Sequence, residues 1–221
     1  MIIKKGRCCL VPKKTFFRLD EEKQERVVRA AISEFHANGF TKAKVETIAE
    51  NAGVAKGSIY QYFENKKELF MHSVTWAMEY FMREIDKYTP LQEMDVFDYL
   101  LKDGRKRVEL LKQETTLMLF FQDIMTGKFG SLTKTINDEL WKIGDKYILQ
   151  LIAVGKQKGT LRTDLNDLIL ALYYKGVTSQ FDDYVFRIIT ENNFELSDSV
   201  YQEIEATINQ VIELLKNGMG R

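Results

Sequence analysis

Apolar side chains recur every three to four residues along most of this 221-residue chain, which is the spacing of one face of an α-helix. We find no convincing alternation of the kind that marks a β-strand, and no internal repeat. Pro12 and Pro90 are the only prolines, so nearly everything between them can be helical. The pattern therefore predicts an all-α fold of about nine helices.

The first third of the pattern predicts four helices, of which the middle two are short. Their expected ranges are 20–38, 44–52, 55–63 and 66 to about 88. Gly39 and Gly53 stand at the ends of the first and second helix, where a glycine commonly terminates a helix. Two short helices joined by a tight glycine turn form the helix-turn-helix arrangement.

The third of these helices combines an apolar face with an unusual polar one. Ile59 and Phe63 are four residues apart and therefore share one face, which we expect to be buried. Lys56, Tyr60 and Gln61 point elsewhere and offer a positive charge, a hydroxyl group and an amide. Such a helix suits the major groove of DNA. The alternative is an ordinary solvated surface helix.

Beyond Pro90 the pattern predicts a larger helical body. We expect helices over 97–111, 115–125, 132–159, from an Asp164 N-cap to about 189, and 197–216, with breaks at Gly127, Gly130 and Gly159. Asp164 is the expected cap because a carboxylate there accepts hydrogen bonds from the free N–H groups of the first turn. Most of the aromatic and methionine side chains of the body are expected to form its core.

The formal net charge of the chain is zero, but the charge is unevenly distributed. Up to Tyr62 there are 12 lysines and arginines against 7 acidic residues, a net charge of +5, and after it 20 against 25, a net charge of −5. A basic first part on an acidic body fits a nucleic-acid-binding module joined to a domain with another task. No apolar run reaches the roughly 20 residues that a membrane-spanning helix needs.

The residues that usually carry catalysis or bind metals form no recognisable motif. Cys8 and Cys9, the only cysteines, are adjacent, which provides neither a disulfide framework nor metal-ligand spacing and suits a reducing cytoplasm. His36 and His72 lie far apart and are expected to be ordinary helix residues. Without a carboxylate pair, a Cys/His dyad or a glycine-rich phosphate loop, we expect no enzyme activity, no metal and no cofactor.

The first ten residues differ from the rest of the chain and lack the cleavage site of a secretory signal. We interpret them as an artefact of the chosen start, with Val11 encoded by a GTG start codon; a disordered tail is the alternative. Lys13, Lys14 and Arg18, which follow, are expected to form a basic arm that contacts phosphate groups.

The first third of the chain also resembles the DNA-binding domain of TetR-family transcriptional regulators. The matching residues, at the spacing of the family pattern, are Gly39-Phe40, Ile48-Ala49, Ala52-Gly53-Val54, Lys56-Gly57-Ser58-Ile59-Tyr60, Tyr62-Phe63 and Lys66. The resemblance implies a tail over residues 1–19, a DNA-binding domain over 20–82 and an effector-binding and dimerisation domain over 83–221.

Two positions depart from the family pattern. Ala43-Lys44 stands where the family often has two hydroxyl residues, so Lys44 would reach a phosphate by charge alone. Ala55 stands where a serine commonly caps the recognition helix, and the loss of such a cap costs typically ~1 kcal/mol. We therefore expect this helix to depend more on DNA for its order.

The resemblance implies a set of DNA contacts. Lys44, Tyr60 and Lys66 would bind phosphates, the last at the N-terminus of its helix, and Gly57 would allow close approach to the DNA backbone. The positions expected to meet base edges or adjacent phosphates are Lys56, Ser58, Gln61 and Tyr62. Gln61 suits a bidentate contact with adenine. Core packing is the alternative for Tyr62 and the preferred interpretation of Phe63.

The body is expected to hold an effector and a dimer interface, as the resemblance implies. An apolar, aromatic cavity would suit a hydrophobic or aromatic effector. The candidate lining residues are Met118, Phe121, Met125, Trp141, Tyr147, Tyr173, Tyr174 and Phe181. The last two helices would pair with their copies in a homodimer, through the candidates Ala171, Val177, Tyr184, Ile188, Ile204, Ile208, Val211 and Leu215.

The sequence therefore indicates a homodimeric, cytoplasmic, one-component transcriptional regulator. We expect it to repress transcription and to leave its double-stranded operator DNA when a small-molecule effector binds. One alternative is an α-helical ligand-binding protein or enzyme whose N-terminal helices are only structural. The other is a protein that binds DNA regardless of sequence.

Overall fold

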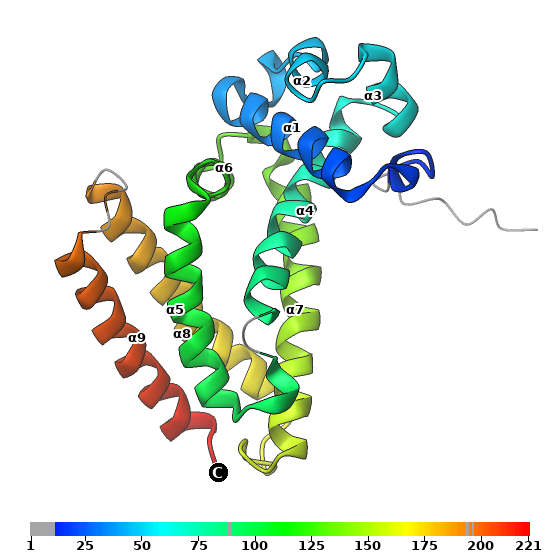
Figure 1. The fold of residues 1–221 in the computed structure, drawn as a ribbon. Coiled ribbons are helices and arrows are strands. Elements are labelled where there is room, and N and C mark those ends of the chain that lie inside the picture. The colour runs from blue at the N-terminus through cyan, green and yellow to red at the C-terminus, as the bar shows by residue number, and fades with distance from the viewer. Residues whose placement is uncertain (1–11, 88–89, 193–194, 196) are drawn as a thin grey trace, which may run out of the picture. The chain divides into compact units, whose positions relative to one another are not determined.

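The computed structural model describes residues 12–87, 90–192, 195 and 197–221, and within them the chain forms nine α-helices and three short 3-10 helices (Figure 1). The all-α prediction is confirmed. The β structure in these ranges is limited to an isolated bridge between Leu161 and Gly220. None of the described helices is both long and apolar enough to cross a bilayer. The first ten residues, interpreted as a start-site artefact, lie outside the described ranges.

The chain divides into two compact units. The first unit comprises the chain up to Tyr80 together with Thr116–Leu140, and the second unit comprises Phe81–Thr115 with Trp141–Arg221. Residues 116–140 thus belong with the N-terminal helices, although the sequence assigns them to a domain over 83–221. The division into DNA-binding and effector-binding domains at residues 82 and 83 stays a prediction about function.

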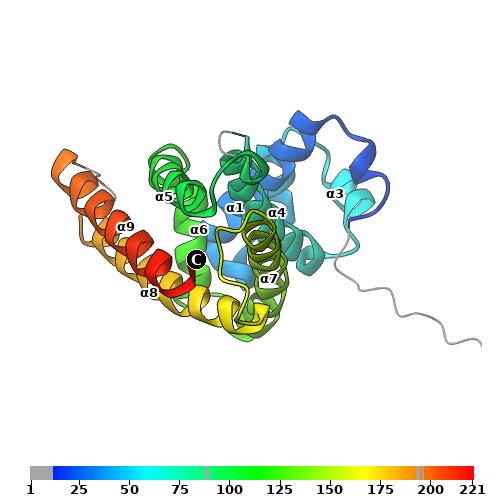
Figure 2. The same ribbon diagram turned by 90° about the horizontal axis from the view of Figure 1, so that it is seen from below.

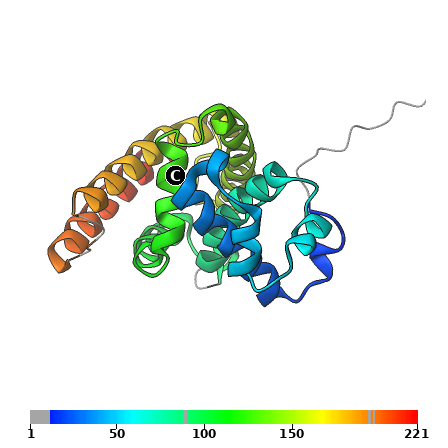
Figure 3. The same ribbon diagram turned by 90° about the horizontal axis from the view of Figure 1, so that it is seen from above.

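The first unit contains the expected helix-turn-helix. Its elements are η1 (Phe16–Arg18), α1 (Glu21–Lys42), α2 (Val45–Asn51), α3 (Lys56–Tyr62), the first part of α4 (Lys66–Asp86), α6 (Thr115–Met125), η3 (Gly130–Leu132) and the first part of α7 (Thr133–Gln157). The helices α1, α2 and α3 form the blue and cyan part of the ribbon (Figure 3). Each of these α-helices overlaps a range expected from the hydrophobic pattern, whereas η1 was not expected.

The ends of α1 follow from two local signals. The Asp20 carboxylate accepts a hydrogen bond from the backbone N–H of Lys23 at 2.8 Å, which caps the helix. Gly39 interrupts the helical conformation with φ 65° and ψ 172°, as the sequence predicts. This change of direction lets Phe40 turn back, and its ring stacks on that of Phe35 with centroids 6.1 Å apart.

Within the first unit, α6 is joined to α1 by polar contacts. His36 Nδ1 on α1 lies 2.7 Å from Asp123 Oδ2 on α6. The ammonium of Lys128, just after α6, donates to the same carboxylate oxygen at 2.8 Å and to the backbone carbonyl of His36. His36 lies in a helix, as expected from the sequence, and these bonds connect α1 to the 116–140 segment.

The second unit holds the remaining helices. Its elements are the end of α4, η2 (Leu91–Glu93), α5 (Val96–Gln113), the end of α7, α8 (Asp167–Glu191) and α9 (Asp198–Met219). The cap of α8 is Asn166, whose side chain accepts from the backbone N–H of Ile169 at 2.9 Å. The expectation that Asp164 caps this helix is wrong. Its carboxylate pairs with Arg162, and this hydrogen bond lowers the pKa of Asp164 to about 2.

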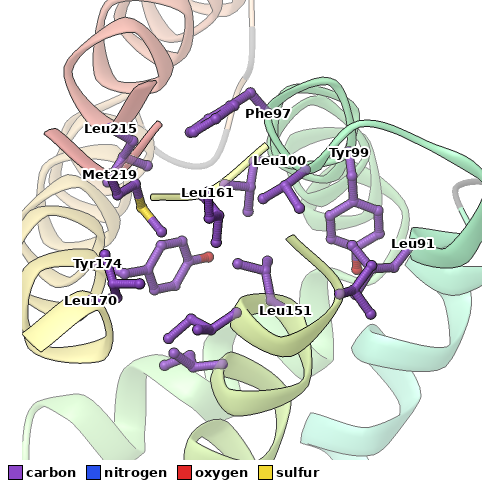
Figure 4. Close-up of a cluster of buried hydrophobic side chains, with 14 residues drawn as sticks. Leu91, Phe97, Tyr99, Leu100, Leu151, Leu161, Leu170, Tyr174, Leu215 and Met219 are labelled. Atoms are coloured by element: carbon purple, nitrogen blue, oxygen red, sulfur yellow. The ribbon is translucent and has the colours of Figure 1, made fainter. Parts of the chain in front are cut away.

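The core of the second unit gathers side chains from α5, α7, α8 and α9 (Figure 4). Leu161, in the connection after α7, is fully buried in it. A Cβ atom on Gly155 would lie 2.5 Å from the Leu161 side chain, so only glycine fits at this point of α7. The α8 and α9 helices lie side by side (Figure 2). Arg162 N–H donates to the carbonyl of Met219 at 3.0 Å, which fixes the end of α9.

His72, on α4, is held among aromatic rings in the core of the first unit. Its ring centroid lies 5.2 Å from that of Phe16 and 5.7 Å from that of Phe63. Its Nε2 atom is buried without a hydrogen-bond partner. Burial lowers the pKa of His72 from 6.5 to about 4, because desolvation disfavours the charged imidazolium.

We expect the free energy of unfolding to fall as the pH is lowered from 6.5 to about 4. In that window the unfolded chain binds a proton at His72 and the folded chain does not, so acid favours unfolding by up to roughly 2–3 kcal/mol. His72→Leu, of similar volume, should lose this part of the pH dependence in urea unfolding. The same pH dependence in both proteins would contradict a buried neutral imidazole.

Candidate nucleic-acid interface

The α3 helix has one buried and one exposed face, as the sequence predicts. Ile59 and Phe63 are buried, whereas Lys56, Tyr60 and Gln61 are exposed. The apolar pair fixes the orientation of the helix on the first unit. The polar side chains are therefore presented outwards from a fixed backbone, as a recognition helix requires.

The turn between α2 and α3 is closed by two backbone hydrogen bonds. Gly53 adopts φ 66°, and its N–H donates to the carbonyl of Glu50 at 3.0 Å. The N–H of Val54 donates to the carbonyl of Ala49 at 2.9 Å. A positive φ suits glycine, which carries no Cβ, so this turn explains the glycine that the sequence places here.

The N-terminus of α3 has no side-chain cap. Ala55 occupies the cap position and forms no side-chain hydrogen bond there, as expected from the departure from the family pattern. The N–H of Ser58 donates to the carbonyl of Ala55 at 2.9 Å. The other N–H groups of the first turn point towards the exposed end of the helix, where phosphate oxygens are suitable acceptors.

The residues before α1 hold the other end of α3, which the sequence did not reveal. Lys13 and Thr15 donate to the carbonyl oxygens of the last three α3 residues, at 2.9 Å for the Lys13 ammonium and 2.8 Å for its backbone N–H. These carbonyls have no partner within the helix, so the arm completes it. Lys13 is thus used by the fold, while Lys14 and Arg18 are exposed.

Phe16 packs into the core and thereby fixes the position of this arm. Its side chain is buried, with ring centroids 5.0 Å from Phe63 and 6.0 Å from Tyr62. Tyr62 itself is only 7% exposed. These contacts favour the core-packing alternative for Tyr62, which was expected to meet DNA.

A side chain of α1 accepts a hydrogen bond from the backbone N–H at the start of α2. Lys44 precedes α2 and has no side-chain cap of its own. Its backbone N–H donates to Glu34 Oε1 at 2.8 Å, and Glu34 is buried. A carboxylate at a helix N-terminus is electrostatically favourable, so Glu34 replaces the hydroxyl groups missing at Ala43-Lys44. The Lys44 side chain is exposed, as a phosphate contact requires.

Lys56 is paired with an acidic residue on α2. Its ammonium contacts the carboxylate of Glu46. This hydrogen bond lowers the pKa of Glu46 and raises the pKa of Lys56. Both groups are exposed, so solvent and salt screen the pair strongly. A DNA phosphate that binds Lys56 must compete with Glu46.

Lys66 has a structural partner that the sequence did not suggest. Its ammonium donates to the carbonyls of Thr41 and Ala43 at 3.1 and 3.0 Å, and it lies 5.0 Å from the centre of the Phe40 ring. These contacts join the start of α4 to the α1–α2 connection. They account for a cation at this helix N-terminus without a bound phosphate, so the proposed phosphate contact of Lys66 stays a prediction.

The start of α4 is also capped by its own residues. The N–H of Glu68 donates to Asn65 Oδ1 at 2.9 Å, and the N–H of Glu64 donates to Glu68 Oε2 at 2.7 Å. This resembles a capping box, except that Glu68 accepts from Glu64, the residue before the Asn65 cap, and not from the cap itself. Its asparagine and glutamate, three residues apart before an apolar run, are a local signal that sequence analysis should have found.

The eight candidates for an effector pocket are divided between the two units. Met118, Phe121 and Met125 belong to the first, and the second contains Trp141, Tyr147, Tyr173, Tyr174 and Phe181. Met125 and Trp141 are 68% and 66% exposed. These two side chains project from the surface, which does not suit the lining of an enclosed pocket. For the other six, a pocket stays a prediction.

Half of the candidates for the dimer interface are already buried within the chain. These four are Ile188, Ile204, Ile208 and Leu215. The regular apolar stripes of α8 and α9 face the core, so these four positions are not available to a second copy. Ala171, Val177, Tyr184 and Val211 are half-buried. The exposed apolar side chains, which we name the α8–α9 apolar surface, are Leu168, Ile169, Leu172, Tyr173 and Leu214.

The first unit has the geometry of a helix-turn-helix DNA-binding protein. A family model described as "Bacterial regulatory proteins, tetR family" matches residues 27–72. The "Probable acrEF/envCD operon repressor" of Escherichia coli (strain K12) is 33% identical over 161 residues, which cover 71% of this chain and 72% of that protein. The chain belongs to the TetR family of transcriptional regulators, and it is a DNA-binding regulator rather than an enzyme.

One further relative and one solved structure of the same fold match most of the chain. The "Fatty acid metabolism regulator protein" of Bacillus subtilis (strain 168) is 25% identical over 198 residues, which cover 89% of this chain and 95% of that protein. The crystal structure of the transcriptional regulator FadR from Bacillus subtilis in complex with stearoyl-CoA has a TM-score of 0.65, at 22% identity and with 88% of this chain and 98% of that chain covered. This structural likeness supports the fold.

We expect Glu46→Gln to strengthen binding to any duplex DNA about two- to fivefold at low salt. The reason is that Lys56 would bind a phosphate without first giving up its pair with Glu46. The slope of log affinity against log salt concentration should also become steeper. Fluorescence anisotropy over several salt concentrations measures both quantities.

The matched control is Glu50→Gln, which removes the same charge from an exposed position of α2. An equal effect of the two substitutions would show that net charge alone matters. No effect of Glu46→Gln would show that its pair with Lys56 is irrelevant to binding.

Proposed function

We propose that this protein is a homodimeric repressor that leaves its operator when an apolar effector binds. The observation that carries the DNA-binding part is the exposed polar face of α3, held by a buried apolar face, a closed glycine turn and the N-terminal arm. We assign base contacts to Gln61 and Ser58 and phosphate contacts to Lys44, Lys56 and Tyr60.

Gly57 supports this assignment. A Cβ atom at this position would meet no protein atom within 4 Å. The fold therefore does not need a glycine here, and glycine inside a helix costs roughly 0.5–1 kcal/mol relative to alanine. A close approach of the DNA backbone to α3 gives a reason for this residue.

The dimer would form through the α8–α9 apolar surface. Leu168, Leu172 and Leu214 are each more than half exposed. The Tyr173 hydroxyl donates to the carbonyl of Leu214 at 2.9 Å, which ties the α8 and α9 parts of this surface together. A soluble monomer rarely exposes large apolar side chains in one group, and a second copy would cover them. In such a dimer the two α3 helices would enter successive major grooves, about 34–36 Å apart.

Two observations support an apolar effector. The second unit has a large apolar and aromatic core formed by α5, α7, α8 and α9. A relative is a fatty acid metabolism regulator, and a protein of the same fold was crystallised with stearoyl-CoA. A molecule with a long acyl chain is therefore the first effector class to test.

The effector response would pass along helices that belong to both units. The α4 and α7 helices each run from one unit into the other. An effector that binds the DNA-free state more tightly would change the separation of the two α3 helices. Release of DNA without a change in that separation would contradict this route.

A gel-shift series with DNA from around the protein's own gene, at several salt concentrations, tests the proposal. The expected result is a retarded complex at one region, with much weaker binding to shifted or unrelated fragments. Equal binding to all fragments would support sequence-independent binding. Unchanged binding by the Tyr60→Ala variant would support a purely structural role for the N-terminal helices.

Gly57→Ala should stabilise the folded protein by roughly 0.5–1 kcal/mol and weaken operator binding by about tenfold. Urea unfolding and anisotropy titrations measure the two effects. Gly144→Ala in α7, where a Cβ also meets no atom within 4 Å, is the control and should leave DNA binding unchanged. Unchanged DNA affinity of Gly57→Ala would refute the close approach.

Leu172→Glu should convert a dimer to a monomer, because the introduced carboxylate would be buried without a partner in the interface. Sedimentation equilibrium gives the mass directly. Gln180→Glu, which adds the same charge at an exposed polar position of α8, should stay dimeric. A wild-type monomer, or a dimeric Leu172→Glu variant, would rule out this interface.

A further inference from the structure

A charged pair lies inside the second unit, on α5. Asp103 is 4% exposed, and the Nε–H of Arg107, one turn later, donates to its Oδ2 atom at 2.8 Å. The Arg107 side chain is half-buried, with 38% of it exposed, whereas the carboxylate of Asp103 is buried. Burying a carboxylate costs several kcal/mol unless its lone pairs are satisfied.

Only one oxygen of this carboxylate is satisfied. Asp103 Oδ1 is buried and has no hydrogen-bond partner. An unsatisfied buried acceptor costs about 1–3 kcal/mol, and more when the group is charged. Buried polar atoms in folded proteins nearly always have a protein, water or ligand partner, so Oδ1 is open to a donor from outside the chain.

Three tyrosines from three helices interact electrostatically with this carboxylate. They are Tyr99 on α5, Tyr147 on α7 and Tyr174 on α8, and the Tyr147 hydroxyl donates to that of Tyr99 at 3.1 Å. Burial and then the charge of Asp103 raise the pKa of Tyr99 to about 12, and the same causes raise the pKa values of the other two. The hydroxyl groups therefore stay protonated at neutral pH.

These polar groups border the apolar core of the second unit. Tyr99 and Tyr174 are both members of that core, and Figure 4 shows their side chains directed into it from α5 and α8. A polar cluster next to a large apolar surface is the usual composition of a small-molecule site. A buried ion pair that served only stability could be replaced, both partners together, by apolar side chains with little loss.

We propose that Asp103 Oδ1 accepts a hydrogen bond from an O–H or N–H group of the effector, whose apolar part packs on the adjoining core. This inference rests on the effector response proposed above and specifies its chemistry. Burial raises the pKa of Asp182, which also interacts with Arg107 and Asp103, and so favours its neutral form. Arg107 then balances the charge of Asp103, and a neutral donor such as a hydroxyl or amide group fits. In an acyl thioester of coenzyme A, the amide N–H groups of the pantetheine arm are donors of this kind.

Binding of matched small probes tests the donor requirement without DNA. Octanol, its methyl ether and octanoate share one chain and differ in the head group. Isothermal titration of the full-length wild-type protein should show octanol binding at least about tenfold more tightly than the ether, the effect expected of one hydrogen bond to a charged acceptor. Asp103→Asn should abolish this preference, whereas Asp98→Asn, at an exposed position of α5, should keep it.

Several outcomes would overturn the proposal. These are equal binding of octanol and its ether, no binding of any probe, or a preference that persists in Asp103→Asn. Tighter binding of octanoate would show that Arg107 selects the head group instead. Octanol and its ether are compared on the wild-type protein, which needs no variant. That comparison therefore stays decisive even if circular dichroism shows that Asp103→Asn does not fold. DNA binding is measured separately, so failure there would refute the proposed function and not this site.

Discussion

The arrangement of the first unit depends on the burial of one face of α3. This helix has only seven residues, far too few to be stable by itself in water. Ile59 and Phe63 bury its apolar face, and Phe16 packs against Phe63 from the arm before α1. The exposed polar face therefore has a defined position only because the aromatic core behind it is complete.

Several residues expected to contact DNA instead form contacts within the first unit. Lys13 and Lys66 are cations that a sequence pattern assigns to phosphate, yet both donate to backbone carbonyls at helix ends. Tyr62 packs on Phe16. Fewer cations than expected therefore remain for DNA. Lys44 and Lys56 are exposed, and Glu46 pairs with Lys56 and so reduces the local positive charge.

The helices and their ends could be predicted because they depend on local spacing. The spacing of apolar residues predicted each helix. Gly39 and Gly53 predicted where the first two helices end, and both adopt a positive φ. The contacts of Glu34 with Lys44 and of Thr15 with Gln61 join residues 10 and 46 positions apart. Such pairs carry no local pattern, so the sequence did not reveal them.

The candidate sites on α8 and α9 show a related limit. Periodicity identified the most regular apolar positions, such as Ile204 and Ile208, and these face the core of their own chain. An interface between copies needs apolar residues left over after folding, and these lie outside the regular stripes, in the first two turns of α8 and at Leu214 of α9. Buried charge is similarly invisible in a sequence, because Asp103 and Arg107 look like an ordinary surface pair one turn apart.

The proposed operator binding requires two α3 helices to bind one face of duplex DNA. Hydroxyl-radical footprinting of the protein on DNA upstream of its own gene tests this directly. We predict two protected segments whose centres are about 10 base pairs apart or a multiple of that distance, arranged symmetrically. A uniform lack of protection at low ionic strength, or a single unpaired segment, would contradict it.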